Sequence, residues 1–548
     1  MGETSSDLVE QIREGYAVEG AALDLGAAVV DGTAHADVTV RISLSAMNRH
    51  GLVAGATGTG KTKTLQLMAE QLVEQGVPVF LADIKGDLSG MASPGEGNDK
   101  IAARSEDVGM PWEPTAYPVE FYSLGGVGTG VPVRAAVSTF GPTLLAKVLG
   151  LNDTQESSLG LIFHYADKEG LYLDTIADLR AVVQHLTSDE GKAELKELGG
   201  LSTSTAGVIL RELIAFSDQG ADAFFGLPEF DTNHLLTTTD DGRGLVSMLE
   251  LPAVQDRPAL FSTFLMWLLA DLFHDLPEMG DLDKPKLVFF FDEAHLLFDD
   301  ASKDFLDAIQ QTVRLIRSKG VGVFFVTQSP QDVPAHVLGQ LGNRVQHALR
   351  AFTPDDSAAI RETVRTYPHT DYDLEELLTM LGTGEAVVTV LSEKGAPTPV
   401  AWTRMRAPES LMSPSPDAVV EAAVAASALQ AEYGRPLERD SALEVLAAAR
   451  EERERAEAEA EAAEEKAAAD AAAAKEAEKA RAAADRAAAD ERAAAEKAAR
   501  RAAEKEAAEP GIVEQVVKSS AFRSALRSAG TVIGREITRS VFGTSKRR

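Results

Sequence analysis

The sequence predicts an α/β protein with a nucleotide-binding core, a helical insertion and a long C-terminal helical tail. Three observations predict it. A phosphate-loop pattern follows the apolar run 52–54 and precedes helical apolar spacing over residues 64–75. A second apolar run ends in the pair Asp292-Glu293. Residues 441–509 consist almost entirely of alanine, glutamate, lysine and arginine, which strongly favour helix.

The phosphate loop is the most informative stretch. Residues 55–62 read GATGTGKT and satisfy the G-x-x-x-x-G-K-[ST] pattern. Its glycines let the backbone curl so that successive N–H groups face a polyphosphate. A glycine-rich turn without a ligand is the alternative, but strand, loop and helix occur in the order that a phosphate site requires. We expect the ATP-binding residues to be Gly55, Ala56, Thr57, Gly58, Thr59, Gly60, Lys61, Thr62 and Lys63.

The second nucleotide signature is residues 286–293, which read KLVFFFDE. A fully buried strand here would deliver Asp292 beside the Mg²⁺ ion that the Thr62 hydroxyl also binds, and Glu293 beside the attacking water. A metal-binding carboxylate next to a water-activating one suits hydrolysis. His295 is either catalytic or an ordinary histidine at a helix start.

Two other polar residues follow predicted strands. Asp83 ends the apolar run 77–83, at the strand edge that lines the ligand crevice in doubly wound sheets. A simple strand-end turn is the alternative reading of Asp83. Gln328 follows the apolar run 321–326 and could orient water or sense the γ-phosphate.

Phosphoryl transfer also needs a cation for the charge that develops on the γ-phosphoryl group. Arg314 and Arg317 lie three residues apart on the predicted amphipathic helix 305–319 and share a face. Arg344 precedes a predicted strand over residues 345–352. We expect one of these three arginines to supply the cation, with Arg317 favoured.

Composition limits the function classes. The chain has no cysteine, which excludes disulfides, zinc–thiolate sites and thiol nucleophiles and fits a reducing cytoplasm. No secretory signal is visible, and the longest apolar run, residues 260–273, is too short to span a membrane. The net charge of −32 lies wholly in the first 440 residues. Such a surface repels nucleic acid at long range, so we expect any DNA contact to be local, as in a ring pore.

The chain is predicted to consist of successive segments. They are a small β element at 1–46, the phosphate-loop half of the core at 47–100, a mainly helical insertion at 101–285, the second half of the core with a C-terminal hairpin at 286–406, a linker and helix at 407–440, an Ala/Glu/Lys/Arg-rich helix at 441–509, and a basic amphipathic segment at 510–548.

The two C-terminal segments carry no site motif. The alanine-rich helix lacks a heptad of large apolar residues, so a solvated single helix or an alanine-packed pair is expected, acting as a spacer. The basic segment could lie on anionic lipid, dock on the acidic core or contact nucleic acid, and docking on protein is favoured because acidic surface is plentiful.

Several stretches together resemble one family. GATGTGKT, LADIKGDLSG, FFFDEAHLL, RLIRSKGVGVFFVTQSP and LGNRVQHALRAFTPDD are similar to the HerA/FtsK superfamily of ring-forming P-loop ATPases, most of all to bacterial HerA-like proteins of the YjgR type. The resemblance covers about residues 10–410 and the final basic segment. It implies a RecA-like αβα core, a homo-oligomer that we expect to be a hexamer, and ATP hydrolysis at subunit interfaces.

The resemblance also implies roles for individual residues. Lys61 and Thr62 would bind phosphate and Mg²⁺, Asp292 would hold Mg²⁺, Glu293 would activate water, Gln328 would be the polar sensor, and Arg317 would act in trans. We expect an ATP-driven DNA translocase or helicase-like motor. The alternatives are an ATPase that acts on protein or membrane-associated assemblies, and a nucleotide-binding scaffold, against which the Asp292-Glu293 pair argues.

Overall fold

A computed structural model describes residues 2–189, 191–197, 200, 202–280, 282–298 and 303–506. The chain divides into two compact units, Met1–Glu451 and Glu452–Arg548, which are described separately. The predicted basic segment 510–548 lies outside the described residues. None of the described helices has the length and apolar character needed to cross a membrane.

The first unit is built on a twelve-stranded sheet with the order β2-β1-β12-β11-β10-β3-β9-β8-β4-β7-β5-β6. The strands from β10 to β6 in this order run parallel, and β11, β12, β1 and β2 extend the sheet in antiparallel pairing. The strands are β1 (Ala22–Val30), β2 (Thr33–Ser43), β3 (Gly51–Ala54), β4 (Val79–Asp83), β5 (Val119–Leu124), β6 (Val131–Val133), β7 (Val246–Glu250), β8 (Leu287–Phe291), β9 (Val321–Thr327), β10 (Asn343–His347), β11 (Glu385–Thr389) and β12 (Ala401–Met405).

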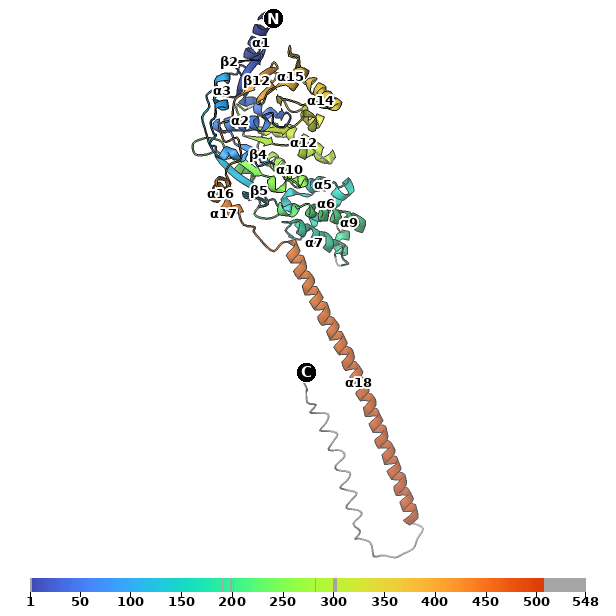
Figure 1. Cartoon of the computed structure of the whole chain (residues 1–548). Helices are drawn as coiled ribbons and strands as arrows, with labels where there is room; N and C mark the ends of the chain where they lie inside the picture. The colour runs from blue at the N-terminus through green and yellow to red at the C-terminus, as the bar shows by residue number, and fades with distance from the viewer. Residues whose placement is uncertain are drawn as a thin grey trace. The chain divides into compact units, whose positions relative to one another are not determined.

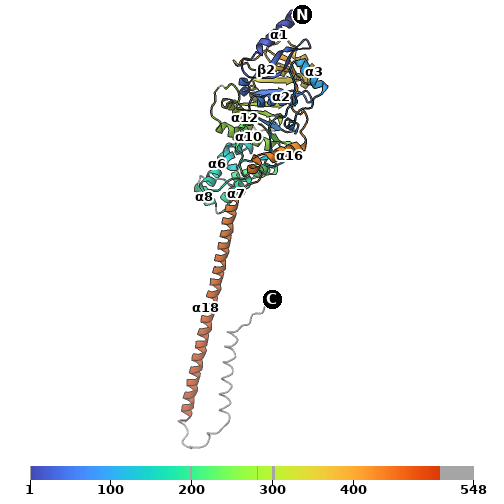
Figure 2. The same cartoon turned by 90° about the vertical axis from the view of Figure 1, so that its left-hand side faces the viewer.

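Helices cover both faces of the sheet and form the insertion, with α1 at one end of this unit and α6 and α7 at the other (Figures 1 and 2). The helices are α1 (Gly2–Gly15), α2 (Lys61–Glu74), α3 (Asp99–Val108), α4 (Val137–Phe140), α5 (Pro142–Val148), α6 (Asp153–Lys168), α7 (Ile176–Thr187), α8 (Lys192–Glu197), α9 (Thr203–Asp218), α10 (Pro258–Asp275), α11 (His295–Phe298), α12 (Lys303–Ile316), α13 (Ala335–Leu338), α14 (Pro354–Val364), α15 (Leu374–Met380), α16 (Asp417–Ala426), α17 (Leu429–Tyr433) and α18 (Ala442–Glu506).

The central strands are apolar throughout because both of their faces are covered. Every residue of β8 and β9 is buried. Along β8, Phe289 and Phe291 pack into one apolar cluster with α10 and α12, and Phe290 packs into the opposite cluster with α2. This alternation is the side-chain period of a strand. The α/β fold predicted from the sequence, with its helical insertion and C-terminal helix, is confirmed.

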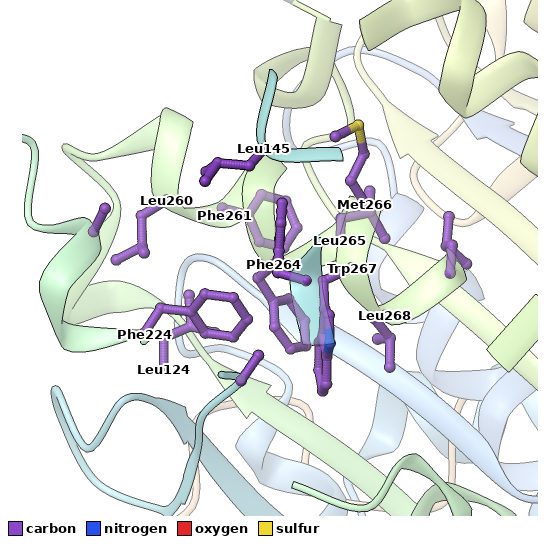
Figure 3. Close-up of a cluster of buried hydrophobic side chains, with 14 of the residues drawn as sticks. Leu124, Leu145, Phe224, Leu260, Phe261, Phe264, Leu265, Met266, Trp267 and Leu268 are labelled. Carbon is purple, nitrogen blue, oxygen red and sulfur yellow. The ribbon is translucent and has the colours of Figure 1, made fainter. Parts of the chain in front are cut away.

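The longest apolar run, residues 260–273, forms most of helix α10. Its aromatic side chains fill the space between the sheet and the insertion, where Phe264 and Trp267 face Phe224 (Figure 3). The ring centroids lie 5.9 Å apart for Phe224 and Phe264, and 5.6 Å apart for Phe224 and Trp267. Burial of rings in edge-to-face contact supplies much of the attachment of the insertion to the core.

Some local structure differs from the prediction. Helix α1 was not expected, although Ile12 is fully buried and anchors it to β1 and β2. The strand predicted over 345–352 is β10, which starts earlier and ends at His347. It ends there because the Ala348 carbonyl turns toward the phosphate loop and Leu349 N–H donates to Leu378. The domain boundaries remain predictions, and the insertion range contributes β5, β6 and β7 to the sheet as well as helices.

Helix α18 begins within the first unit. Leu443 N–H donates to an Asp178 carboxylate oxygen over 3.0 Å, and the Ser441 hydroxyl donates to the same carboxylate. Ala442 is fully buried. Beyond residue 451 the described side chains of α18 are almost all exposed, as its alanine-rich sequence predicts. The first turns of this helix therefore belong to the folded body.

Candidate nucleotide-binding site

The two sequence signatures meet at the carboxyl edge of neighbouring parallel strands. Strand β3 lies beside β9, with Ala54 opposite Thr327, and β9 lies beside β8, with Phe325 opposite Phe291. The phosphate loop, Gln328 and the Asp292-Glu293 pair each follow one of these strands. The strand order therefore brings the three stretches together at one edge, as expected for a ligand site in an open α/β sheet.

The phosphate loop connects β3 to α2 through a glycine-rich turn. Gly58 and Gly60 have φ angles of 77° and 119°, which a residue with a side chain rarely adopts. A Cβ atom on Gly55 would lie 2.5 Å from the Cβ of His347. Because α2 begins at Lys61, the N–H groups of its first turn have no partner within the helix and face the loop. This is the arrangement that binds an anion.

Strands β10 and β11 support the loop from one side. Ala56 N–H donates to the Ala348 carbonyl over 2.8 Å, and Gly384 N–H donates to the Thr59 carbonyl over 2.9 Å. The Thr59 hydroxyl closes the turn by donating to the Ala56 carbonyl over 2.7 Å. The loop therefore holds its curved shape through its own hydrogen bonds and those of two neighbouring segments.

His347 lies under the loop and was not singled out from the sequence. Its Nδ1 lies 2.8 Å from the Glu385 carbonyl, and its Nε2 lies 2.9 Å from the Thr64 hydroxyl in the first turns of α2. A carbonyl only accepts, so Nδ1 carries the proton and the Thr64 hydroxyl donates to Nε2. Burial lowers the pKa of His347 to about 4, so the ring is neutral at neutral pH.

Lys61 projects from the start of α2 and is buried. Its Nζ lies 3.4 Å from the Ala56 carbonyl, and burial lowers its pKa. Lys63 donates to Gln66 over 3.2 Å, and Thr62, the expected Mg²⁺ ligand, is partly exposed at the loop. Lys61 thus brings a positive charge into the loop. A bound phosphate group would offset the free-energy cost of burying that charge.

Asp292 is 1% exposed at the end of β8. Its Oδ1 accepts the Glu293 N–H over 2.9 Å, and its Oδ2 has no hydrogen-bond partner among the described residues. Burial and the neighbouring Glu293 raise the pKa of Asp292 to about 7. An unpartnered buried carboxylate oxygen fits a divalent cation. The described residues hold no cluster of three or more metal-ligating side chains.

Glu293 has both carboxylate oxygens occupied. Its backbone adopts a φ of 47°, which a residue with a side chain rarely takes. Oε1 contacts the Nζ of Lys85, while Oε2 lies 3.4 Å from the Gln328 Nε2 and 3.3 Å from the His295 Nδ1. Burial alone would raise the pKa of Glu293, but the contacts with Lys85 and Gln328 hold it below its ordinary value.

Lys85 is the second site residue that the sequence did not identify, and Asp83 positions it. The Asp83 carboxylate is fully buried and accepts the backbone N–H groups of Lys85, Gly86 and Leu88 over 3.2, 2.7 and 2.7 Å. These bonds fix the loop after β4, which lies next to β8. Burial raises the pKa of Asp83 to about 6. Asp83 therefore organises the site edge through its own loop.

The three arginines lie elsewhere. Arg317 starts the 3₁₀ turn Arg317–Lys319 that precedes β9, and Arg314 lies in the last turn of α12. Both are exposed, and the length of β9 places them about 20 Å from the site end of that strand. Arg344 donates to the Thr366 hydroxyl over 2.6 Å. The structure brings none of the three to the phosphate loop of its own chain.

The fold and the site geometry define a P-loop α/β protein of the RecA-like class, with both nucleotide signatures in place. The family model described as helicase HerA-like C-terminal matches residues 29–548, so the chain belongs to that family. The resemblance seen in the motifs is confirmed.

Individual relatives are distant. The chain is 23% identical over 361 residues to the DNA double-strand break repair helicase HerA of Sulfurisphaera tokodaii, covering 64% of this chain and 64% of the relative. Among solved structures, the bacterial conjugative coupling protein TrwBdeltaN70 matches with a TM-score of 0.47 at 15% identity, over 74% of this chain and 94% of that one. VirB4 of Thermoanaerobacter pseudethanolicus matches with a TM-score of 0.46 at 16% identity, over 71% and 98%.

Proposed function

We propose that the protein is a Mg²⁺-dependent ATPase that works as a ring motor. The observation that carries this proposal is the convergence of the buried Lys61, the unpartnered Asp292 oxygen and the buried Glu293 on one sheet edge beside an anion-binding loop. Lys61 and the loop amides would hold the triphosphate. Thr62 and Asp292 would hold Mg²⁺, which neutralises phosphate charge when bound.

Glu293 is the group that acts on water in this proposal. It would accept a proton from the water as the water oxygen bonds to the γ-phosphorus and the bond from that phosphorus to the β–γ bridging oxygen breaks, giving ADP and phosphate. Gln328 would orient the water, and its amide, 3.4 Å from Glu293 Oε2, supports that role. His295, close to the same oxygen, would help to orient the carboxylate.

Two substitutions separate binding from chemistry. Lys61→Ala should abolish nucleotide binding, since it removes the cation of the loop. Glu293→Gln should keep ATP binding and lose turnover, since only the water-activating carboxylate is removed. Calorimetric binding and phosphate release measure the two effects, and equal loss of binding in both variants would contradict the separate roles.

The ring proposal rests on the position of Arg317. If Arg317 takes part in catalysis, an exposed side chain about 20 Å from its own site would have to act on another subunit, and arginine fingers contribute roughly 10³–10⁵ in rate where they operate. Arg317→Ala should therefore bind ATP and assemble normally but hydrolyse poorly. Mixing the Arg317→Ala variant with Glu293→Gln subunits should restore activity at those interfaces where an intact Glu293 of one subunit meets an intact Arg317 of the next. The absence of rescue in subunit-exchanging mixtures would exclude a shared site.

The proposed substrate is DNA, threaded through a hexameric ring in the cytoplasm. The family and the name of the Sulfurisphaera relative, a DNA double-strand break repair helicase, support this choice, and the match spans 64% of that relative. The net charge of −32 favours the second candidate, an ATPase that acts on protein assemblies. Stimulation of ATP turnover by DNA, measured over a salt series, decides between them, because phosphate contacts weaken as salt rises. Turnover unaffected by DNA at low salt would favour the protein substrate.

A further inference from the structure

The lysine that contacts Glu293 is half-exposed, whereas its partner is buried. The Lys85 side chain is 47% exposed and the Glu293 side chain is 5% exposed. Contact with Glu293 raises the pKa of Lys85 although burial opposes the rise. Lys85 therefore stays charged and reaches into the site from its rim.

The contact competes with water for the proposed base. A carboxylate that activates water accepts the proton on one of its oxygens, and here Lys85 contacts Oε1 while Gln328 and His295 lie near Oε2. Each oxygen therefore already has a nitrogen neighbour, and the positive charge of Lys85 opposes proton transfer to Glu293 while the two stay in contact.

Among these partners, Lys85 is the one that bound ATP would attract and whose side chain can move away from Glu293. Its Cα is fixed by the hydrogen bonds that Asp83 makes to its loop, but its four-carbon stem rotates at the solvent edge. A triphosphate bound by Lys61 would bring several negative charges next to Glu293. A single carboxylate competes poorly with such a charge for one ammonium group.

We propose that Lys85 is a γ-phosphate-binding residue that releases Glu293 when ATP binds. The inference deepens the proposed ATPase function and rests on it. In the resting state Lys85 holds Glu293 inactive. With ATP bound, Lys85 moves to the γ-phosphate. This movement frees Glu293 Oε1 and neutralises part of the charge of the γ-phosphate, a group that ADP does not have. ATP loading and activation of the base are thereby coupled through one side chain.

The test compares a non-hydrolysable ATP analogue with ADP in calorimetric titrations with Mg²⁺, on the full chain. Lys85→Met should weaken binding of the ATP analogue by roughly 10- to 100-fold, the range for one hydrogen bond to a charged group, and leave ADP affinity within about twofold. Lys85→Arg should restore part of the preference. Lys192→Met is the matched control, because Lys192 forms an exposed ion pair with Asp189 on the insertion.

A double-mutant cycle adds a readout that a structural role would not change. Glu293→Gln should tighten binding of the ATP analogue because it releases Lys85, and this gain should vanish when Lys85→Met is also present. Equal weakening of both nucleotides, or an unchanged preference for the ATP analogue, would overturn the inference while leaving the ATPase proposal intact. Absence of ATP hydrolysis by the unaltered protein would instead overturn the proposed function.

Discussion

Thr64→Val should destabilise the first unit by about 1–3 kcal/mol, the cost of leaving a buried hydrogen-bonding group unsatisfied. Thr64 is 2% exposed and His347 is fully buried. Valine nearly matches threonine in shape but places a methyl group against Nε2, 2.9 Å from the present hydroxyl. Water has no access to that nitrogen, and the Nδ1 bond to the Glu385 carbonyl prevents a change of tautomer.

Urea unfolding followed by tryptophan fluorescence measures the effect. All three tryptophans, Trp112, Trp267 and Trp402, lie in the first unit, so the signal reports on it and is silent on α18. The free-energy change comes from the shift in the unfolding midpoint. Nucleotide affinity should fall as well, because Thr64 fixes the helix turn that carries Lys61 and Thr62.

The control is a double-mutant cycle with His347→Leu. If the hydroxyl donates to Nε2, the double variant should lose less stability than the sum of the two single variants, because removing both polar partners leaves no orphaned group on this bond. Additive losses would refute the assigned bond. So would a Thr64→Val variant whose free energy of unfolding lies within about 0.5 kcal/mol of that of the unaltered protein, which is the usual range for neutral surface substitutions.

Three further predictions follow from other buried contacts. Glu70, which accepts the Glu409 N–H over 2.9 Å, has its pKa raised by burial to about 7, so its contribution to stability is present below pH 4.5 and is lost as pH rises through 7. As pH rises from 5 to 8, the free energy of unfolding of Glu70→Gln should therefore increase by up to about 3 kcal/mol relative to that of the unaltered protein. A pH-independent difference between the two proteins would contradict this. Truncation after residue 451 should preserve the melting temperature. Truncation after residue 440 should lower it, because it removes the Ser441 and Leu443 donors to Asp178. Equal melting temperatures of the two truncated proteins would contradict a stabilising role for these donors. Gly55→Ala should lose ATP binding in titration, because its Cβ would lie 2.5 Å from the His347 Cβ, and normal affinity would show that the loop can shift.

The sequence alone was sufficient to predict the features that depend on contiguous residues. The phosphate loop and the pair Asp292-Glu293 each combine a strand with the polar residues that follow it, so local pattern alone located them. Burial on both faces made the central strands apolar throughout, and the parallel α/β fold followed from that pattern. The apolar run that marks α10 and the amphipathic spacing that predicted α12 are also local.

The features that were missed depend on strand order. Lys85 contacts Glu293 only because β4 lies next to β8, and His347 supports the loop only because β10 lies next to β3. Neither adjacency is encoded in a local pattern, so a lysine after a strand and a histidine at a strand end looked ordinary. Asp83 was placed correctly at the strand edge, but its role in holding its own loop required knowledge of which N–H groups it accepts.

The two sides of the phosphate loop differ in how firmly they are held. On the β10–β11 side, His347 and Thr64 are buried and fully hydrogen-bonded, so any movement there would break bonds that water cannot replace. On the β8–β4 side, Lys85 is half-exposed and Gln328 is exposed, so both can exchange a protein contact for a ligand at little cost. The loop is thus fixed on one side and adjustable on the other. Thr64→Val should therefore act mainly on stability, and Lys85→Met should act on the distinction between ATP and ADP.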